Sequence, residues 1–184
     1  MTRVVGLDIS LTNTGVAVLG PDSTDLFRVS SKTCPDNIGS RLSRFDGVLA
    51  KMPETSRDDL VVIEQPAFSR TNGKHHDRSG LWWFVVDNAA SSGSRVVEAP
   101  PSTVKKYATG KGNAGKMEVM AAVIKRFPQL TIHDDNEADA VVLSALGARL
   151  LGHPVDGELP QAHMSAFTAW KKMLRDQGVS LADL

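Results

Sequence analysis

The first 30 residues alternate between short apolar runs and polar turns. Residues 4–9 and 14–19 are rich in β-branched side chains, and a turn of Ser, Thr, Asn and Gly separates them. This pattern predicts a strand, a tight turn and an antiparallel return strand. Residues 25–30 follow a Gly-Pro-Asp turn and predict a third strand. We therefore expect the N-terminal part of the chain to form an antiparallel meander.

After the meander, the apolar spacing changes to that of helices alternating with strands. Residues 38–51 place apolar side chains at helical spacing and end before Pro53, which predicts an amphipathic helix. Residues 60–63 form a continuous apolar run, as in a strand buried on both faces. This alternation predicts an α/β fold with a mixed sheet and right-handed crossovers. The later elements are expected as an exposed loop over 68–77, a helix over 80–90, a strand over 95–98, and helices over 101–107, 116–127 and 135–151.

The last 30 residues predict an additional helix. A linker containing Gly and Pro comes first, and an apolar stripe at helical spacing follows it. The stripe consists of Met164, Phe167, Trp170 and Leu174. Because 184 residues can hold one good core, we expect one domain over 1–152, with a linker and C-terminal helix over 153–184.

Composition narrows the functional classes. Lys plus Arg and Asp plus Glu each number 21, which argues against indiscriminate binding to polyanions. The single cysteine, Cys34, leaves neither a disulfide framework nor a thiolate zinc site. The first residues lack a secretory signal pattern, and no apolar run reaches membrane-spanning length. A cytoplasmic protein without membrane contact is the expectation.

Charge is nevertheless distributed unevenly along the chain. Residues 95–126 hold seven Lys and Arg against two Glu, whereas residues 134–139 hold four acidic side chains. A basic strip beside an acidic cluster suits a metal-dependent nuclease, which must hold both phosphates and cations. A solvated helix face is the alternative explanation for the strip.

Three carboxylates stand at positions that could meet in space. Asp8 lies inside the first apolar run, where a buried carboxylate needs a partner such as a metal ion. Capping of the following turn is the alternative role for Asp8. Glu64 ends the buried fourth strand, and Asp139 lies near the start of the late helix. If the first and fourth strands are neighbours and this helix packs on them, the three carboxylates share one site.

A fourth ligand should lie on the same helix face as Asp139. Asp135 and Asn136 precede it by four and three residues and meet this condition, whereas Glu137 points away. Hard oxygen ligands of this kind select Mg²⁺, with Mn²⁺ as a substitute. Two such ions about 4 Å apart are the usual arrangement for in-line phosphodiester hydrolysis. We therefore expect two ions per site.

These motifs occur in an order that resembles a known family. The motifs are Gly6-Leu7-Asp8-Ile9-Ser10 with Thr14-Gly15, Ile63-Glu64-Gln65, the basic segment from Val104-Lys105-Lys106 to Lys116, and Glu137-Ala138-Asp139-Ala140. Over about residues 3–152 they look like the RuvC Holliday junction resolvases of the RNase H-like superfamily. The composition resembles phage or actinobacterial versions of that family.

The resemblance implies an RNase H-like mixed five-stranded sheet flanked by helices, and a Mg²⁺-dependent endonuclease that acts as a homodimer on branched DNA. It also implies that Lys105 and Lys116 contact the scissile phosphate or stabilise charge in the transition state. Phe68 is the candidate for the aromatic ring that the family inserts into the junction, although Pro66-Ala67 shifts it by one residue. Packing of this ring on the core is the alternative. Further expected DNA contacts are Arg70, Lys74, Lys106 and Lys111.

One ligand position departs from the family pattern. Bacterial members usually carry Asp or His three residues before the last aspartate, where this chain has Asn136. Either Asp135 replaces that ligand, or Asn136 coordinates a metal through its amide oxygen.

Two other functions fit parts of the pattern. An actin-like ATPase or sugar-kinase fragment also opens with a Gly-x-Asp strand, but such enzymes need two domains around their nucleotide. A catalytically idle branched-DNA-binding module would keep the basic strip and lose the acidic residues. For the homodimer, the apolar helix over 80–90 is the candidate interface, and the C-terminal helix is a rival cover for its exposed face.

Overall fold

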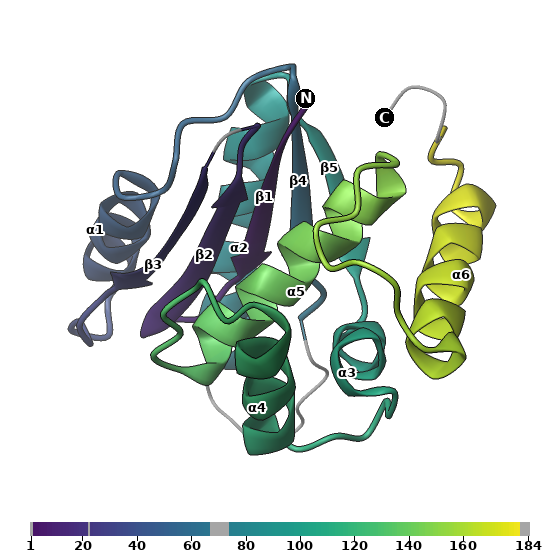
Figure 1. The fold of residues 1–184 in the computed structure, drawn as a ribbon. Helices are drawn as coiled ribbons and strands as arrows, with labels where there is room; N and C mark the ends of the chain where they lie inside the picture. The colour runs from purple at the N-terminus through teal and green to yellow at the C-terminus, as the bar shows by residue number, and fades with distance from the viewer. Residues whose placement is uncertain (1, 22, 67–73, 181–184) are drawn as a thin grey trace.

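The central element is a mixed sheet. The computed structural model describes residues 2–21, 23–66 and 74–180, and within them five strands lie in the order β3-β2-β1-β4-β5 (Figure 1). β1 pairs antiparallel with β2 and parallel with β4, β2 pairs antiparallel with β3, and β4 pairs parallel with β5. The predicted meander and mixed sheet are confirmed. The strands are β1 (Arg3–Asp8), β2 (Asn13–Leu19), β3 (Thr24–Ser30), β4 (Asp59–Glu64) and β5 (Arg95–Ala99).

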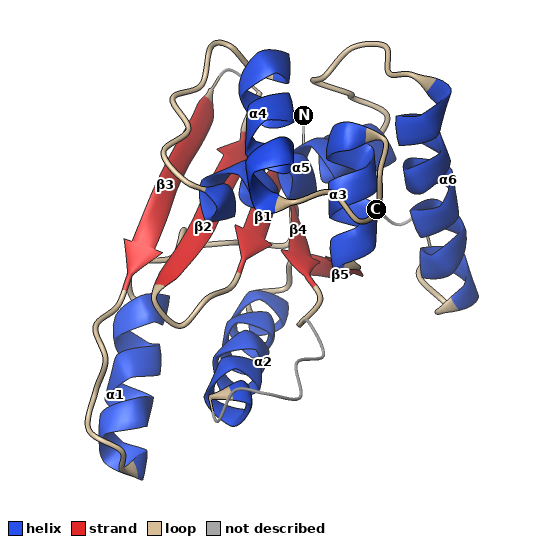
Figure 2. Cartoon of the chain, turned by 90° about the horizontal axis from the view of Figure 1, so that it is seen from below, coloured by secondary structure: helices blue, strands red, loops and turns tan. Residues whose placement is uncertain are grey.

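Helices cover both faces of the sheet, as Figure 2 shows. On one face, α1 and α2 pack into an apolar cluster with the strands, and α3, α4, α5 and α6 share a second cluster on the other face. Successive side chains of a strand point to opposite faces, so the same strands supply both clusters. The helices are α1 (Ile38–Leu49), α2 (His75–Ser91), α3 (Pro101–Thr109), α4 (Lys116–Arg126), α5 (Asp135–Leu150) and α6 (Gln161–Asp176).

The helix α5 lies directly on the backbones of β1 and β2 because two glycines lack a side chain there. A Cβ atom at Gly6 would lie 2.2 Å from the carbonyl oxygen of Ala140. At Gly15 it would lie 2.0 Å from the carbonyl oxygen of Asn136. Neither approach is possible for a residue with a Cβ atom, so the two glycines fix the height of α5 above the sheet.

The C-terminal helix α6 packs beside α3, on the same face of the sheet as α5 (Figures 1 and 2). Its predicted apolar stripe is confirmed, since Phe167, Trp170 and Leu174 are buried and Met164 packs against the same cluster. The indole Nε1 of Trp170 donates a hydrogen bond of 2.8 Å to the carbonyl oxygen of Glu98 in β5. The idea that α6 covers α2 is wrong, because the two helices lie on opposite faces.

A buried polar network connects the linker before α6 to the rest of the fold. The side chain of Asp156 is fully buried and accepts hydrogen bonds from the Tyr107 hydroxyl at 2.6 Å and from Arg149. Arg149 Nε also donates to the Tyr107 hydroxyl at 2.7 Å. The network therefore joins the linker to α3 and α5.

Two local expectations differ from the structure. α2 begins at His75, so residues 75–77 are helical and do not belong to the exposed loop that the sequence suggests. In α1, Phe45 is buried, but Ile38 and Leu42 are 74% and 49% exposed. No helix among the described residues is both long enough and apolar enough to cross a membrane.

Candidate functional site

Asp8 and Glu64 lie side by side at the carboxyl ends of two neighbouring parallel strands. Leu7 in β1 is in register with Ile63 in β4, and each carboxylate residue comes next in its strand. The two carboxyl groups lie close enough that the charge of Asp8 raises the pKa of Glu64, in addition to the rise caused by burial. The indole Nε1 of Trp82 in α2 donates to the Glu64 carbonyl oxygen at 2.8 Å and so holds the end of β4.

The turn after β1 does not need Asp8 as a cap. The Thr14 hydroxyl donates to the carbonyl oxygen of Ser10 at 3.0 Å and accepts from the Ser10 N–H at 3.2 Å. Thr14 is fully buried, so these two bonds close the turn from inside the fold. Among the described residues, Thr14 takes the role that the capping alternative gave to Asp8.

α5 brings two more carboxylates to the same place. Its first turn carries Asp135 and its second carries Asp139, and Asp134 caps the helix by accepting a hydrogen bond of 2.9 Å from the Glu137 N–H. The charge of Asp139 raises the pKa values of both Asp8 and Glu64, and Asp135 raises that of Asp8. We call Asp8, Glu64, Asp135 and Asp139 the acidic cluster.

Burial and mutual repulsion perturb the acidic cluster strongly. Burial of the carboxyl group raises the pKa of Asp8, and the charge of Asp139 adds to that rise. The pKa of Glu64 is raised by burial and then by the charge of Asp8. Burial, followed by the charge of Asp135, raises the pKa of Asp139 to about 6. The cluster therefore favours positive charge, and it holds protons when no cation is bound.

Two lysines from different helices face the acidic cluster. Lys116, the first residue of α4, forms an ion pair with Asp135, and its charge lowers the pKa values of Asp8 and Asp139. The charge of Lys105 in α3 lowers the pKa values of Glu64 and Asp139. The ends of the basic segment therefore meet at the carboxylates, although eleven positions separate them in the sequence.

The remaining predicted site residues have different surroundings. Asn136 is half-buried in α5, and Glu137 points away from the cluster as expected, toward Arg28 at 3.2 Å and the backbone N–H of His133 at 2.6 Å. Lys111 is exposed and pairs with Glu118 at 2.9 Å.

Of four further expected DNA contacts, two lie in or next to helices, and two fall outside the described residues. Lys106 is half-buried in the last turn of α3, and Lys74 is exposed directly before α2. Phe68 and Arg70 lie outside the described residues. Their predicted roles stay predictions.

The donor set of the acidic cluster suits hard divalent cations. Four carboxylates offer oxygen ligands of the kind that Mg²⁺ and Mn²⁺ prefer. Burial, and then the negative charge of neighbouring carboxylates, raises the pKa values of Asp8, Glu64 and Asp139. Within residues 2–21, 23–66 and 74–180, no three His, Cys, Asp or Glu side chains converge closely enough to form a ready metal site. The acidic cluster therefore has the right kind of ligand atoms for Mg²⁺ or Mn²⁺, but its side chains would have to move closer together to bind the ion.

Comparison with known proteins identifies the relatives of this chain. The crossover junction endodeoxyribonuclease RuvC of Rickettsia prowazekii is 31% identical over 148 residues, which cover 77% of this chain and 93% of the relative. The chain belongs to the RuvC family. The RuvC of Azorhizobium caulinodans is 29% identical over 157 residues, covering 83% of this chain and 92% of the relative. No protein-family model matches the chain.

Solved RuvC structures share the fold. The Thermus thermophilus RuvC structure matches with a TM-score of 0.59 at 23% identity, covering 82% of this chain and 97% of that one. The same protein in complex with a Holliday junction substrate matches with a TM-score of 0.54 at 25% identity, covering 78% and 91%. The predicted RNase H-like fold of the RuvC family is confirmed.

Sequence reasoning about this RuvC-family chain missed two contacts that organise the site. The hydrogen bond from Trp82 to the end of β4 was not foreseen, since tryptophans in an apolar helix indicate only burial. The ion pair between Lys116 and Asp135 joins residues whose neighbourhood depends on how α4 packs against α5. The opposite charges of the basic strip and the acidic segment were the only feature of the sequence that could have indicated this ion pair.

Proposed function

We propose that this protein is a metal-dependent endodeoxyribonuclease that cuts Holliday junctions or related branched DNA. The observation that supports this proposal best is the acidic cluster itself, in which half-buried carboxylates from β1, β4 and α5 come together beside two lysines. Membership of the RuvC family points to the same activity. In this proposal residues 1–152 form the nuclease domain, and residues 153–184 form an extension.

The acidic cluster would hold two Mg²⁺ ions, with Mn²⁺ as a substitute. Asp8, Glu64 and Asp139 are the proposed shared ligands. Asp135 is favoured over Asn136 as the fourth, because its charge already acts on Asp8 and Asp139. The ions would activate the attacking water and stabilise the leaving oxygen of the phosphodiester.

The lysines have a separate proposed role. Lys116 can exchange its contact with Asp135 for a phosphate oxygen, because the ammonium group is the mobile end of a largely exposed side chain. Lys105 approaches the cluster from α3, on the side of Glu64 and Asp139. Both would stabilise negative charge on the phosphate more strongly in the transition state than in the ground state.

The proposal includes a homodimer. A four-way junction needs two symmetric cuts, which a two-fold dimer can supply. Trp83 in α2 is 64% exposed, and the exposed Ile38 and Leu42 of α1 lie on the same face of the sheet. This apolar surface supports an interface formed by α1 and α2. Light scattering of the wild type and of Trp83→Glu at micromolar concentration tests it, and a monomeric wild type would contradict it.

The central experiment measures cutting of synthetic four-way junctions, forks, flaps and duplexes in Mg²⁺. Asp8→Asn, Glu64→Gln and Asp139→Asn should each abolish cutting and leave junction binding largely intact, because phosphate contacts carry the affinity. Asp176→Asn, an exposed carboxylate on α6, is the matched control and should cut normally. Near-normal cutting by a cluster variant would remove that residue from the site.

The same preparations discriminate the alternatives. ATP hydrolysis without DNA cutting would support the actin-like or sugar-kinase type of ATPase fragment. Tight junction binding with no cutting in Mg²⁺ or Mn²⁺ would support an idle branched-DNA-binding module. Comparing Asp135→Asn with Asn136→Ala decides the fourth ligand, and we expect the larger loss of cutting for Asp135→Asn.

A further inference from the structure

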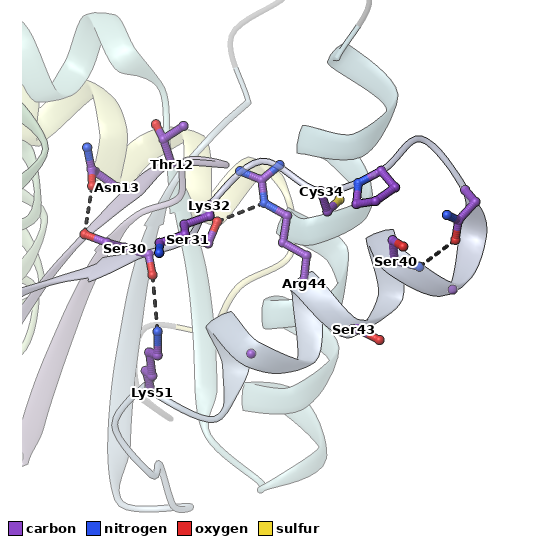
Figure 3. A pocket seen from close by; sticks show the side chains of 14 residues that line it. Thr12, Asn13, Ser30, Ser31, Lys32, Cys34, Ser40, Ser43, Arg44 and Lys51 are labelled. Atoms are coloured by element: carbon purple, nitrogen blue, oxygen red, sulfur yellow. Dashed lines mark hydrogen bonds between the residues drawn. The ribbon is translucent and has the colours of Figure 1, made fainter.

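A large hollow separates the β2–β3 edge of the sheet from α1. Its volume is about 1060 Å³, and it is open to solvent. Figure 3 shows the side chains that line it, which come from the turn before β2, the end of β3, the segment after β3 and one face of α1. None of these residues belongs to the acidic cluster.

The lining carries positive charge that nothing in the lining balances. Lys32, Arg44 and Lys51 contribute three cations, and no Asp or Glu is among the lining residues. Two acidic residues, Asp36 and Asp46, are next to lining residues in the chain, but neither lines the hollow, and Asp36 forms an ion pair with Arg41 at 2.7 Å. Because the chain as a whole is electrically neutral, this local excess is a specific feature of the hollow.

Arg44 is held in place with donors to spare. Its Nε donates to the Ser31 hydroxyl at 2.9 Å, and its Nη2 donates to the carbonyl oxygen of Leu11. In the described residues these two bonds use two of the five N–H groups of a guanidinium. A guanidinium fixed in this way can offer its other N–H groups to an oxyanion with little loss of entropy.

Hydroxyl and amide groups complete a surface that suits phosphate. Ser30, Ser40 and Ser43 line the hollow, and the N-terminal turn of the twelve-residue α1 borders it at Asn37. Hydroxyls, helix N-termini and Lys or Arg side chains are the groups that contact the DNA backbone in protein complexes. The Nζ of Lys51 lies 3.3 Å from the Ser30 carbonyl oxygen, at the other end of the hollow's α1 face.

The hollow lies at the same end of the sheet as the acidic cluster. Two lining residues connect it to β1, whose last residue is Asp8: Thr12 lies in the turn that follows β1, and Asn13 begins β2. Asn13 is in register with Ser30, and its Oδ1 accepts from the Ser30 hydroxyl at 2.9 Å. One connected stretch of turn and strand edge therefore joins the two sites.

We propose that this hollow binds the phosphodiester backbone of a duplex arm whose branch point lies at the acidic cluster. The inference rests on the proposed function and adds a second contact surface to it. A hollow that is open to solvent and carries three cations and several hydroxyl groups suits a backbone that passes over it better than an enclosed small metabolite. Its contribution is sequence-independent affinity and alignment of the arm, separate from the chemistry of cutting.

Cys34 supplies a direct test, because the sole cysteine of the chain lines the hollow. Its alkylation by iodoacetamide is measured in EDTA, where no metal-dependent cutting takes place, with and without four-way junction DNA. At a DNA concentration ten times the Kd, about one molecule in eleven is free, so alkylation should slow by up to about tenfold. Cys34→Ser gives the background of the reagent. An unchanged alkylation rate in saturating DNA would overturn the proposal.

A charge-neutralising pair of variants supplies the second test. Lys32→Gln/Lys51→Gln should weaken junction binding and lower the magnitude of the slope of log Kd against log salt by about 2, since each lost phosphate contact lowers it by about 0.9. Lys171→Gln/Lys172→Gln changes the net charge equally on α6, on the opposite face of the sheet, and should keep the wild-type slope. Equal slopes for both double variants would contradict the proposal.

The outcomes separate this inference from the proposed function. Protection of Cys34 without any metal-dependent cutting would support the backbone site and refute the nuclease. Normal cutting without protection of Cys34 would support the nuclease and refute the backbone site. Inorganic phosphate is tested as a competitor in the same alkylation assay. If it protects Cys34 at the same phosphate concentration as DNA does, the hollow is a site for free anions, and the assignment to a DNA arm is overturned.

Discussion

Replacing Gly15 with alanine should disturb the candidate site through the backbone of α5. The new Cβ atom would lie 2.0 Å from the carbonyl oxygen of Asn136 and 2.4 Å from its carbonyl carbon. Real Cβ contacts begin at about 3.0 Å, so β2 and the first turn of α5 must separate by about 1 Å, the difference between 3.0 and 2.0 Å. Both partners are backbone atoms, which no side-chain rotation can move away.

The displacement should concentrate on the start of α5. The helix is seated against β1 at Gly6, where the Ala140 carbonyl oxygen occupies the space of a Cβ atom, and this contact resists a shift of the whole helix. Overpacking of this kind costs about 1–3 kcal/mol, and the lower entropy of unfolded alanine returns at most about 1 kcal/mol. We expect a net loss of about 1–2 kcal/mol, or roughly 2–8 °C in Tm.

The effect on activity should exceed the effect on stability. Asp139 follows Asn136 by three residues on the displaced segment, and a misplacement of about 1 Å at a catalytic group can cost about 100-fold in rate. Single-turnover cutting of a four-way junction, well below Tm and at saturating Mg²⁺, measures this loss. Junction affinity should change little.

The matched control, Gly20, directly follows the other end of β2. At Gly20 the nearest atoms to a new Cβ are 3.6 Å away, so the Gly20→Ala protein should have the wild-type Tm and the wild-type cutting rate. A folded Gly15→Ala protein that cuts at the wild-type rate would refute the argument that close packing of α5 positions the acidic cluster. An equal loss in Gly20→Ala would refute it as well.

Three further predictions concern the end of β4, the buried polar network and the acidic cluster. Trp82→Phe should cost about 1 kcal/mol in thermal unfolding and lower the cutting rate more than the affinity, because the carbonyl oxygen of Glu64 loses its donor; equal rates would contradict this role. Asp156→Asn should destabilise the fold by about 3 kcal/mol in urea unfolding, because Arg149 is left buried without its counter-charge, and wild-type stability would refute it. The metal-free protein should lose stability as pH rises from 4 to 8, since the folded acidic cluster binds more protons than the unfolded chain. For Asp139 alone, the rise in pKa from 3.8 to about 6 corresponds to up to about 3 kcal/mol, and a flat Tm–pH profile in EDTA would contradict it.

Much of the fold was accessible from the sequence because its signals are local. The alternation of apolar runs and polar turns gave the order of strands and helices, and carboxylates at strand ends indicated which elements should meet. The start of α2 was not predicted, because His75, His76 and Asp77 form a polar stretch. In the structure Asp77 lies in the first turn of α2, where a negative charge is favourable, and pairs with Arg41 of α1 at 3.3 Å.

Contacts that depend on tertiary packing were beyond the sequence pattern. Helical spacing identified Ile38 and Leu42 as part of an apolar stripe, but periodicity does not show how far the sheet extends beneath a helix. The pairing of Lys116 with Asp135 likewise follows from the packing of α4 against α5. The likeness to resolvases suggests the role proposed for these charges, whereas their contact with each other is visible only in the folded structure.

The bond from Trp170 to Glu98 also affects how the protein behaves in a crowded solution. β5 ends the sheet, and a free edge strand offers unpaired backbone groups to any extended chain that passes. α6 occupies one of these acceptors and shields that edge, whereas at the opposite edge β3 exposes Asp25 and Arg28, charges that discourage strand pairing. A chain that loses α6 therefore exposes β5 as an unprotected edge strand. We expect such a chain to self-associate through strand pairing at β5 as well as to unfold more easily.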